Sequence, residues 1–280
     1  MDNHKEGQKK KCKGRIVARG FQEQEKPQSD SPAVLRASVK TFVVTAANEG
    51  FEICSIDITG AFLQAEDLDR EVFVKPPKDI RKDGILWRLK KPLYGLYDSS
   101  RKFYIRVKKM FKDLGLEVLE GDAAYFYMMK DGKLYGQIST HVDDFNMAGE
   151  KEFIEDMVKK ISCELKVSKI EHGQFRFTGI DFKKTSEGIA MTMEDYAKSM
   201  EKIGAFRSGS SEPLTVLEMK VYRKYTGKLM WLAENCRPDL AFTALSMSQK
   251  TSKATVADLK KINKVIDRVH ERESRVMLGK

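Results

Sequence analysis

The sequence has few cysteines and no long apolar run. Its four cysteines, Cys12, Cys54, Cys163 and Cys236, show no C-x-x-C spacing, so a zinc ribbon or a disulfide framework is excluded in favour of free thiols in an intracellular protein. No segment approaches the roughly 18 consecutive apolar residues of a membrane span. Residues 1–13 also lack the apolar core of a signal peptide. We therefore expect an intracellular protein with no membrane partner.

Acidic residues are outnumbered by basic ones. The 280 residues contain 41 Asp and Glu against 51 Lys and Arg, which gives a net charge of +10 and a pI near 9.2. This balance favours a polyanionic partner, with nucleic acid first, although a basic protein need not bind any anion. Hydrophobic residues make up 41% of the chain, which is near the globular average. The length of 280 residues predicts one large domain or two smaller ones.

Hydrophobic periodicity predicts a mixed α/β part followed by a helical part. Residues 1–12 are polar and basic and are expected to be a flexible lead-in. A β-type run with cations between apolar residues is expected at 14–21. Further strands are expected at 51–58, 71–74, 86–89, 125–129 and 134–142 with a hairpin at 174–193, and helices at 31–50, 99–114, 150–161, 194–203, 218–235, 238–250 and 256–272.

Two adjacent acids, Asp143 and Asp144, stand at a tight turn between two expected strands. Neighbouring carboxylates repel each other, and this repulsion destabilises the turn unless a cation offsets it. Asp57 ends an apolar strand, and a third carboxylate held nearby would complete an oxygen-ligand site suited to Mg²⁺. Two such ions would support in-line phosphoryl transfer. The alternative is an ordinary solvated hairpin turn.

The surrounding residues resemble the reverse transcriptase of copia-type retrotransposon polyproteins over roughly residues 11–250. Five matches to the motifs of that family occur in the family order. They are Lys-Gly-Arg-Ile-Val-Ala-Arg-Gly-Phe-Gln at 13–22, Ser-Ile-Asp-Ile-Thr-Gly-Ala-Phe-Leu at 55–63, Leu-Tyr-Gly-Leu at 93–96 with Ser99 and Arg101, His-Val-Asp-Asp at 141–144, and Tyr225-Thr-Gly-Lys-Leu-Met-Trp-Leu-Ala followed by Arg237-Pro-Asp-Leu-Ala-Phe.

The resemblance implies an α+β right-hand polymerase that copies RNA or DNA templates into DNA. Its fingers and ferredoxin-like palm would occupy residues 13–205, and a helical thumb or connection region would occupy residues 206–280. The template with its primer and the dNTPs are the implied partners, and two Mg²⁺ ions, or Mn²⁺, are the implied cofactors. The family also implies the rest of a Pol polyprotein, with integrase and RNase H, which residues 1–280 do not include.

The family motifs assign roles to individual residues. Asp57, Asp143 and Asp144 correspond to the metal-binding catalytic acids. The implied dNTP-binding residues are Phe62 at the position that excludes a 2′-hydroxyl, the cations Lys13, Arg15 and Arg19, and the pair Tyr94 and Gly95. The implied primer-proximal residues are His141, Phe177, Thr178 and Gly179. An ordinary core role remains open for Phe62 and Tyr94, a solvated edge role for the cations, and a structural role for His141.

Several residues depart from the family pattern. His141 replaces a tyrosine, Ser100 replaces a common proline, and Tyr97 with Asp98 replaces a more basic or amide pair. An acid at Asp98 would be unfavourable near template or nucleotide phosphates. The sequence therefore also allows a second hypothesis, in which the chain is a catalytically decayed remnant that binds nucleic acid without extending a primer.

Overall fold

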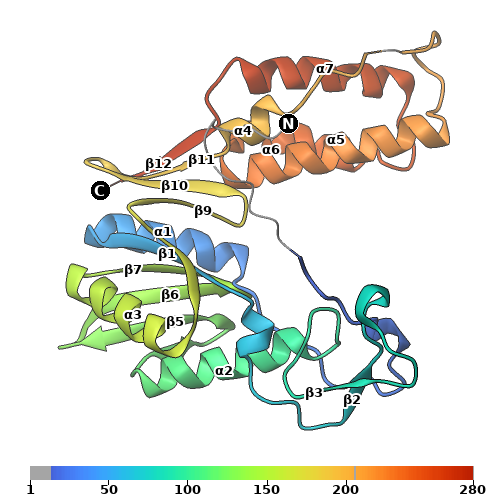
Figure 1. Cartoon of the computed structure of the whole chain (residues 1–280). Helices are drawn as coiled ribbons and strands as arrows, with labels where there is room; N and C mark the ends of the chain where they lie inside the picture. Colours follow the sequence, from blue (N-terminus) through green and yellow to red (C-terminus); the bar gives the residue numbers. More distant parts are fainter. Residues whose placement is uncertain (1–13, 205, 280) are drawn as a thin grey trace, which may run out of the picture.

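A six-stranded antiparallel sheet forms the body of the molecule (Figure 1). The computed structural model describes residues 14–204 and 206–279, so the expected lead-in at 1–12 and Lys13 lie outside the described residues. The strand order is β4-β5-β6-β7-β1-β8, which places β1 between β7 and β8. The strands are β1 (Glu52–Ile58), β4 (Glu117–Leu119), β5 (Asp122–Lys130), β6 (Lys133–His141), β7 (Asp144–Gly149) and β8 (Val167–His172).

Helices cover the two faces of this sheet. Helices α2 (Ser99–Asp113) and α3 (Lys151–Glu164) pack on one face, where Ile56 and Phe145 join their apolar residues in one core. Helix α1 (Arg36–Glu49) shares the second core with Ile53 and Ala148, which point to the other face. Because side chains alternate along a strand, the neighbours of Ile56 and Phe145 face away from α2 and α3. Asp57 and Asp144 therefore lie on the face that α1 covers only in part.

A second sheet and four further helices follow in the described part of the chain. The sheet has the order β12-β11-β10-β9, with β9 (Gln174–Phe177), β10 (Ile180–Thr185), β11 (Gly188–Thr192) and β12 (Arg275–Leu278). The helices are α4 (Glu194–Lys198), α5 (Val216–Asn235), α6 (Ala241–Ser248) and α7 (Val256–His270). The C-terminal part thus ends in a strand that pairs with β11, whereas the sequence pattern predicted helices alone. Strand β12 is four residues long and is held by pairing with β11, a partner far along the chain that local periodicity does not reveal.

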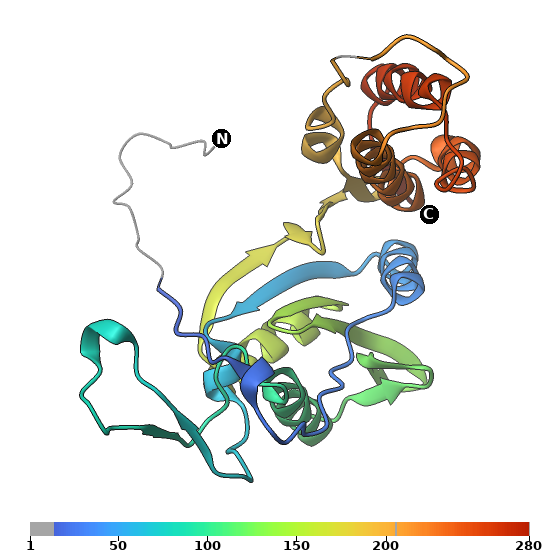
Figure 2. The same ribbon diagram turned by 90° about the vertical axis from the view of Figure 1, so that its right-hand side faces the viewer.

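A small hairpin projects from the body (Figure 2). It consists of β2 (Val72–Val74) paired with β3 (Trp87–Leu89). Along the chain it lies between β1 and α2. The remaining short elements are the 3-10 helices η1 (Gly20–Gln22), η2 (Ala61–Gln64), η3 (Lys78–Ile80) and η4 (Pro238–Leu240). None of the helices in the described part of the chain is both long and apolar enough to cross a membrane.

Three expected elements differ in the structure. Residues 14–19 form no strand, because this run pairs with no sheet and its Ala18 N–H donates to the carbonyl of Tyr94 instead. Helix α1 begins at Arg36 rather than near 31, since the N–H of Leu35 is taken by the carboxylate of Asp122. Helix α4 ends at Lys198 instead of reaching 203. Tertiary hydrogen bonds outweigh local propensity in the first two cases.

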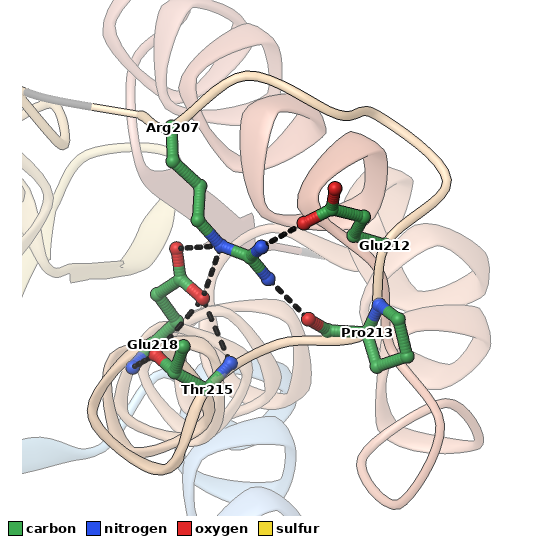
Figure 3. A network of polar contacts seen from close by, with 5 residues as sticks. All are labelled: Arg207, Glu212, Pro213, Thr215 and Glu218. Atoms are coloured by element: carbon green, nitrogen blue, oxygen red, sulfur yellow. Dashed lines mark hydrogen bonds and ion pairs between the residues drawn. The ribbon is translucent and has the colours of Figure 1, made fainter.

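The segment that leads into α5 is fixed by a polar network around Arg207 (Figure 3). The Arg207 Nε lies 3.1 and 3.2 Å from the two carboxylate oxygens of Glu218, and its guanidinium also contacts Glu212 and the carbonyl of Pro213. Thr215 and Glu218 form a capping box at the start of the helix. The capping box satisfies two free N–H groups of the first turn and sets where α5 begins.

The cysteines of the described residues carry no disulfide. Cys54 and Cys236 are buried and Cys163 is exposed, and all three are free thiols, as the spacing predicts. Burial raises the pKa of Cys54 and of Cys236 to about 12, so both thiols stay protonated and unreactive near neutral pH. Cys12 lies outside the described residues.

Candidate active site

The pairing of β1 with β7 brings acids from distant parts of the sequence together. Asp57 and Asp144 are direct partners in the antiparallel register. Asp143 is held at the same place, because its carbonyl accepts a 2.9 Å hydrogen bond from the N–H of Ile58. All three acids are half-buried. Their positions are therefore close to one another at one end of the central strands.

The charges of these acids act on one another. The pKa of Asp144 is raised above its ordinary value of 3.8, first by burial and then by the negative charges of Asp143 and Asp57, with His141 acting in the opposite direction. Lys169 is opposite Asp57 in the register with β8, but its ammonium group lies 2.7 Å from the carboxylate of Glu171. Lys169 is thus engaged with Glu171 and does not pair with the carboxylates at the end of β1 and β7.

Asp57 has a partner that sequence reasoning missed. The hydroxyl of Ser168, on β8, donates to the carboxylate of Asp57 and also lies 3.1 Å from its backbone carbonyl. This contact fixes the orientation of one of the three acids. Ser168 stands in a polar, exposed stretch of sequence with no pattern that would separate it from an ordinary surface serine, so only the β1–β8 register identifies it.

The acids fit a Mg²⁺ site completed by substrate phosphates and water better than they fit a site made of protein ligands alone. Within residues 14–204 and 206–279, no three Asp, Glu, His or Cys side chains converge closely enough to hold a metal ion by themselves. Mg²⁺ usually takes one or two carboxylates and completes its shell with substrate phosphates and water. Burial and then the nearby charges of Asp143 and Asp57 raise the pKa of Asp144, and a bound cation would relieve the electrostatic penalty of its charged form.

Replacing Asp144 by Asn is expected to stabilise the metal-free fold at neutral pH. A carboxyl whose folded-state pKa is raised holds its proton more tightly when folded, so stability falls as pH rises through that pKa. At pH 7 the charged Asp144 is destabilising, and D144N should raise the melting temperature in EDTA. Well below the ordinary value of 3.8, this gain should vanish. Thermal unfolding of wild type and D144N at pH 7 and at pH 3 measures the difference in melting temperature at each pH.

The same measurement has a metal arm and a control. Added Mg²⁺ should stabilise the wild-type chain more than D144N, because a ligand that binds only the folded state raises its stability. Asp131→Asn, in the exposed turn between β5 and β6, is the matched control and should change neither result. A D144N variant that is less stable than wild type at pH 7 would contradict the proposed charge crowding.

Two strained hairpin turns face each other beside the acids. The pair His141 and Asp144 closes the β6–β7 turn, in which Val142 has φ of 59°. The pair Phe177 and Ile180 closes the β9–β10 turn, in which Thr178 and Gly179 have φ of 49° and 83°. Positive φ is a genuine strain for β-branched residues, and such strain gathers at functional sites.

The two turns are in contact through aromatic rings. The rings of His141 and Phe177 meet edge to face with centroids 6.5 Å apart. Phe177 is buried, whereas His141 is exposed. The contact unites the residues that the sequence assigned to the neighbourhood of the primer, although they come from different sheets. It also shows that histidine at this position still supplies an aromatic ring.

A second group of predicted residues, Phe62, Tyr94 and Arg15, lies in mutual contact around the Tyr94 ring. The rings of Phe62 and Tyr94 are tilted against each other with centroids 4.7 Å apart, and the Arg15 Cζ lies 5.6 Å from the centroid of the Tyr94 ring. Gly95 follows Tyr94 with φ of 92°. Phe62 belongs to η2, which follows the Asp57 strand directly. Arg19 is exposed at the start of η1, and the predicted Lys13 lies outside the described residues.

The departure at Asp98 has a different environment from the one its sequence position suggests. Asp98 is 2% exposed, and its carboxylate accepts two hydrogen bonds from Arg70. Its charge is therefore neutralised within the chain instead of facing phosphates. Arg70 lies in a region with no assigned motif, and nothing in the local sequence links it to Asp98, so this pair is visible only in the tertiary structure.

Comparison with known proteins gives the family. Residues 1–210 match the profile of the family described as "Reverse transcriptase (RNA-dependent DNA polymerase)". The Retrovirus-related Pol polyprotein from transposon RE1 of Arabidopsis thaliana is 22% identical over 93% of this chain and 19% of its own length. The corresponding polyprotein from transposon TNT 1-94 of Nicotiana tabacum is 23% identical over 82% of this chain and 19% of its own length.

The chain belongs to the reverse transcriptase family. The resemblance to copia-type reverse transcriptases is confirmed by this match. Among solved structures, a foamy viral protease-reverse transcriptase in complex with ds DNA has a TM-score of 0.42 at 15% identity, over 78% of this chain and 35% of that chain. The chain spans about a fifth of the length of the Arabidopsis and tobacco polyproteins.

Proposed function

We propose that this chain is an RNA-directed DNA polymerase core that adds dNTPs to a primer 3′-hydroxyl. The observation that carries the proposal is the meeting of Asp57, Asp143 and Asp144 at the end of β1 and β7 in a chain of the reverse transcriptase family. The raised pKa of Asp144 supports a site that is electrostatically incomplete without a cation.

In this proposal the three acids hold two Mg²⁺ ions, which Mn²⁺ could replace. When bound, such ions lower the pKa of the attacking hydroxyl and neutralise charge on the leaving pyrophosphate. The residues of the chain do the positioning. Ser168 keeps the Asp57 carboxylate oriented, and the β6–β7 turn holds Asp143 and Asp144 at the strand end. The ends of two neighbouring strands in one sheet form a rigid support for this geometry.

The group formed by Phe62, Tyr94 and Arg15 is the core of the proposed dNTP pocket. Phe62 would lie under the sugar and exclude a 2′-hydroxyl, while Tyr94 and Gly95 would lie beside the new base pair. Arg15 and Arg19, together with Lys13, would face the triphosphate, where fixed cations stabilise charge that develops during transfer. The contacts of Phe62 and Arg15 with the Tyr94 ring support this grouping.

The two facing turns are the proposed support of the primer end. His141, Phe177, Thr178 and Gly179 would contact the primer terminus near the acids. The template and primer would lie across basic surfaces, such as the exposed cations of α5, which are Lys220, Arg223 and Lys224. Binding through phosphates releases counterions, so the affinity should fall steeply as salt is raised.

Primer extension on an RNA template, with Mg²⁺ and Mn²⁺ scanned, tests the proposed activity. We expect metal-dependent incorporation of dNTPs together with salt-sensitive binding of the template and primer. The second candidate is the catalytically decayed remnant, and the exposed His141 in place of tyrosine is the observation that favours it. Salt-sensitive binding with no incorporation at any concentration of either metal would establish the remnant and overturn the polymerase.

A further inference from the structure

Three charged side chains from separate segments meet beside Tyr94 and Gly95. Arg70 precedes β2, Glu23 follows η1, and Asp98 precedes α2. The Arg70 Nε and Nη2 donate to the two carboxylate oxygens of Asp98 at 3.1 and 3.0 Å, and Nη2 also lies 2.7 Å from the carboxylate of Glu23. The side chains of Asp98, Glu23 and Arg70 are 3%, 13% and 19% exposed. We name this group the Arg70 cluster.

The Arg70 cluster lies where the chain has no apolar core. Neither of the two hydrophobic cores includes a residue from 14–30 or from 66–92, both of which the structure describes. A buried ion cluster gives little net stability compared with apolar packing. Removing one of its partners leaves an unpaired buried charge, and its directional bonds can fix one arrangement of the chain. In this region the cluster is therefore a buried charged contact that joins residues 23, 70 and 98 from three separate segments.

The segments joined by the cluster form the proposed dNTP pocket. Beside it, the backbones of Gly20 and Gly95 approach so closely that a Cβ on Gly20 would lie 2.0 Å from the Gly95 carbonyl oxygen. The N–H of Ala18 donates to the carbonyl of Tyr94 at 2.7 Å. Glu23 also accepts from the N–H of Tyr97 at 3.4 Å. The cluster thus holds the strip that carries Arg15 and Arg19 against the turn that carries Tyr94.

We propose that Arg70, Glu23 and Asp98 are positioning residues that set the affinity and sugar selectivity of the dNTP pocket. The inference rests on the proposed polymerase function, and it adds three residues that touch neither nucleotide nor metal. It also explains why an acid is compatible with the position of Asp98. Its charge is held by Arg70, so it acts through the placement of Tyr94 and the 15–19 strip and not through the phosphates.

Arg70→Met and Asp98→Asn test the proposal by primer extension. We expect KM for dNTP to rise about tenfold while kcat stays within about twofold, because small misplacement of a binding group weakens the substrate complex strongly. The ratio of rNTP to dNTP incorporation should rise as well. Asp67→Asn is the matched control, since Asp67 pairs with Lys91 at 2.8 Å in the same region but is 75% exposed. It should leave KM, kcat and the ratio unchanged.

A second readout does not depend on activity. Amide hydrogen exchange at Ala18, whose N–H bonds to Tyr94, should become faster in the Asp98→Asn variant and stay unchanged in Asp67→Asn. The thermal unfolding of each variant establishes that it is folded. Unaltered KM and sugar ratio, or unaltered exchange at Ala18, in a folded Asp98→Asn variant would overturn the proposal. If the wild-type chain extends no primer, the polymerase assignment fails, and the exchange measurement still decides whether the cluster holds the strip.

Discussion

Asp143→Asn should abolish Mg²⁺-dependent primer extension while leaving binding of template and primer intact. A carboxylate that holds a catalytic ion contributes several kcal/mol to the transition state, and each 1.36 kcal/mol is a factor of about ten in rate. We therefore expect a loss of at least about 10³-fold in the single-turnover rate. Asn keeps the size of the side chain, so the β6–β7 turn should persist. Fluorescence anisotropy with a labelled duplex measures the binding.

The control for this variant is the same substitution in another hairpin turn. Asp131 is exposed, lies between β5 and β6, and has φ of 52°, a conformation that asparagine tolerates well. Asp131→Asn should extend primers at the wild-type rate. A rate within about tenfold of wild type for Asp143→Asn would refute the assignment of the acids, and an equal loss in Asp131→Asn would indicate a general effect of lost negative charge.

Phe62→Ala should weaken discrimination against ribonucleotides. The Phe62 ring packs 4.7 Å from Tyr94, and its removal would open space under the sugar of a bound nucleotide. A pocket that differs by a small apolar group changes discrimination by roughly 10- to 100-fold. We expect kcat/KM for rNTPs to rise relative to that for dNTPs by a factor in this range. Steady-state incorporation of matched dNTP and rNTP pairs gives the ratio.

Phe73→Ala is the matched control for the sugar selectivity. Phe73 lies on β2 and is 53% exposed. The substitution therefore removes the same kind of ring from the projecting hairpin and leaves the contacts of Phe62, Tyr94 and Arg15 unchanged. Its ratio should equal that of wild type. If Phe62→Ala lowers incorporation of both nucleotide types equally, Phe62 is an ordinary packing residue, which is the alternative that the sequence left open.

Some elements of the fold are fixed by residues near one another in the sequence, and others by partners far along the chain. The hydrophobic periods predict β1, α2, α5 and α7 closely, and Thr255 with Asp258 forms a capping box at the start of α7. These elements are determined by residues a few positions apart. The elements that differ, the run at 14–19 and the strand β12, depend on partners far along the chain, which are the Tyr94 carbonyl and strand β11.

The sequence by itself determined the family and the order of its motifs, and it predicted the three acids, because each motif is a short run whose residue types carry its chemistry. Only the tertiary structure decided that Ser168 orients Asp57, that His141 meets Phe177 and that Arg70 neutralises Asp98. These contacts join side chains whose distance is set by strand register and loop placement. No local periodicity records that distance, so it follows only from the folded chain.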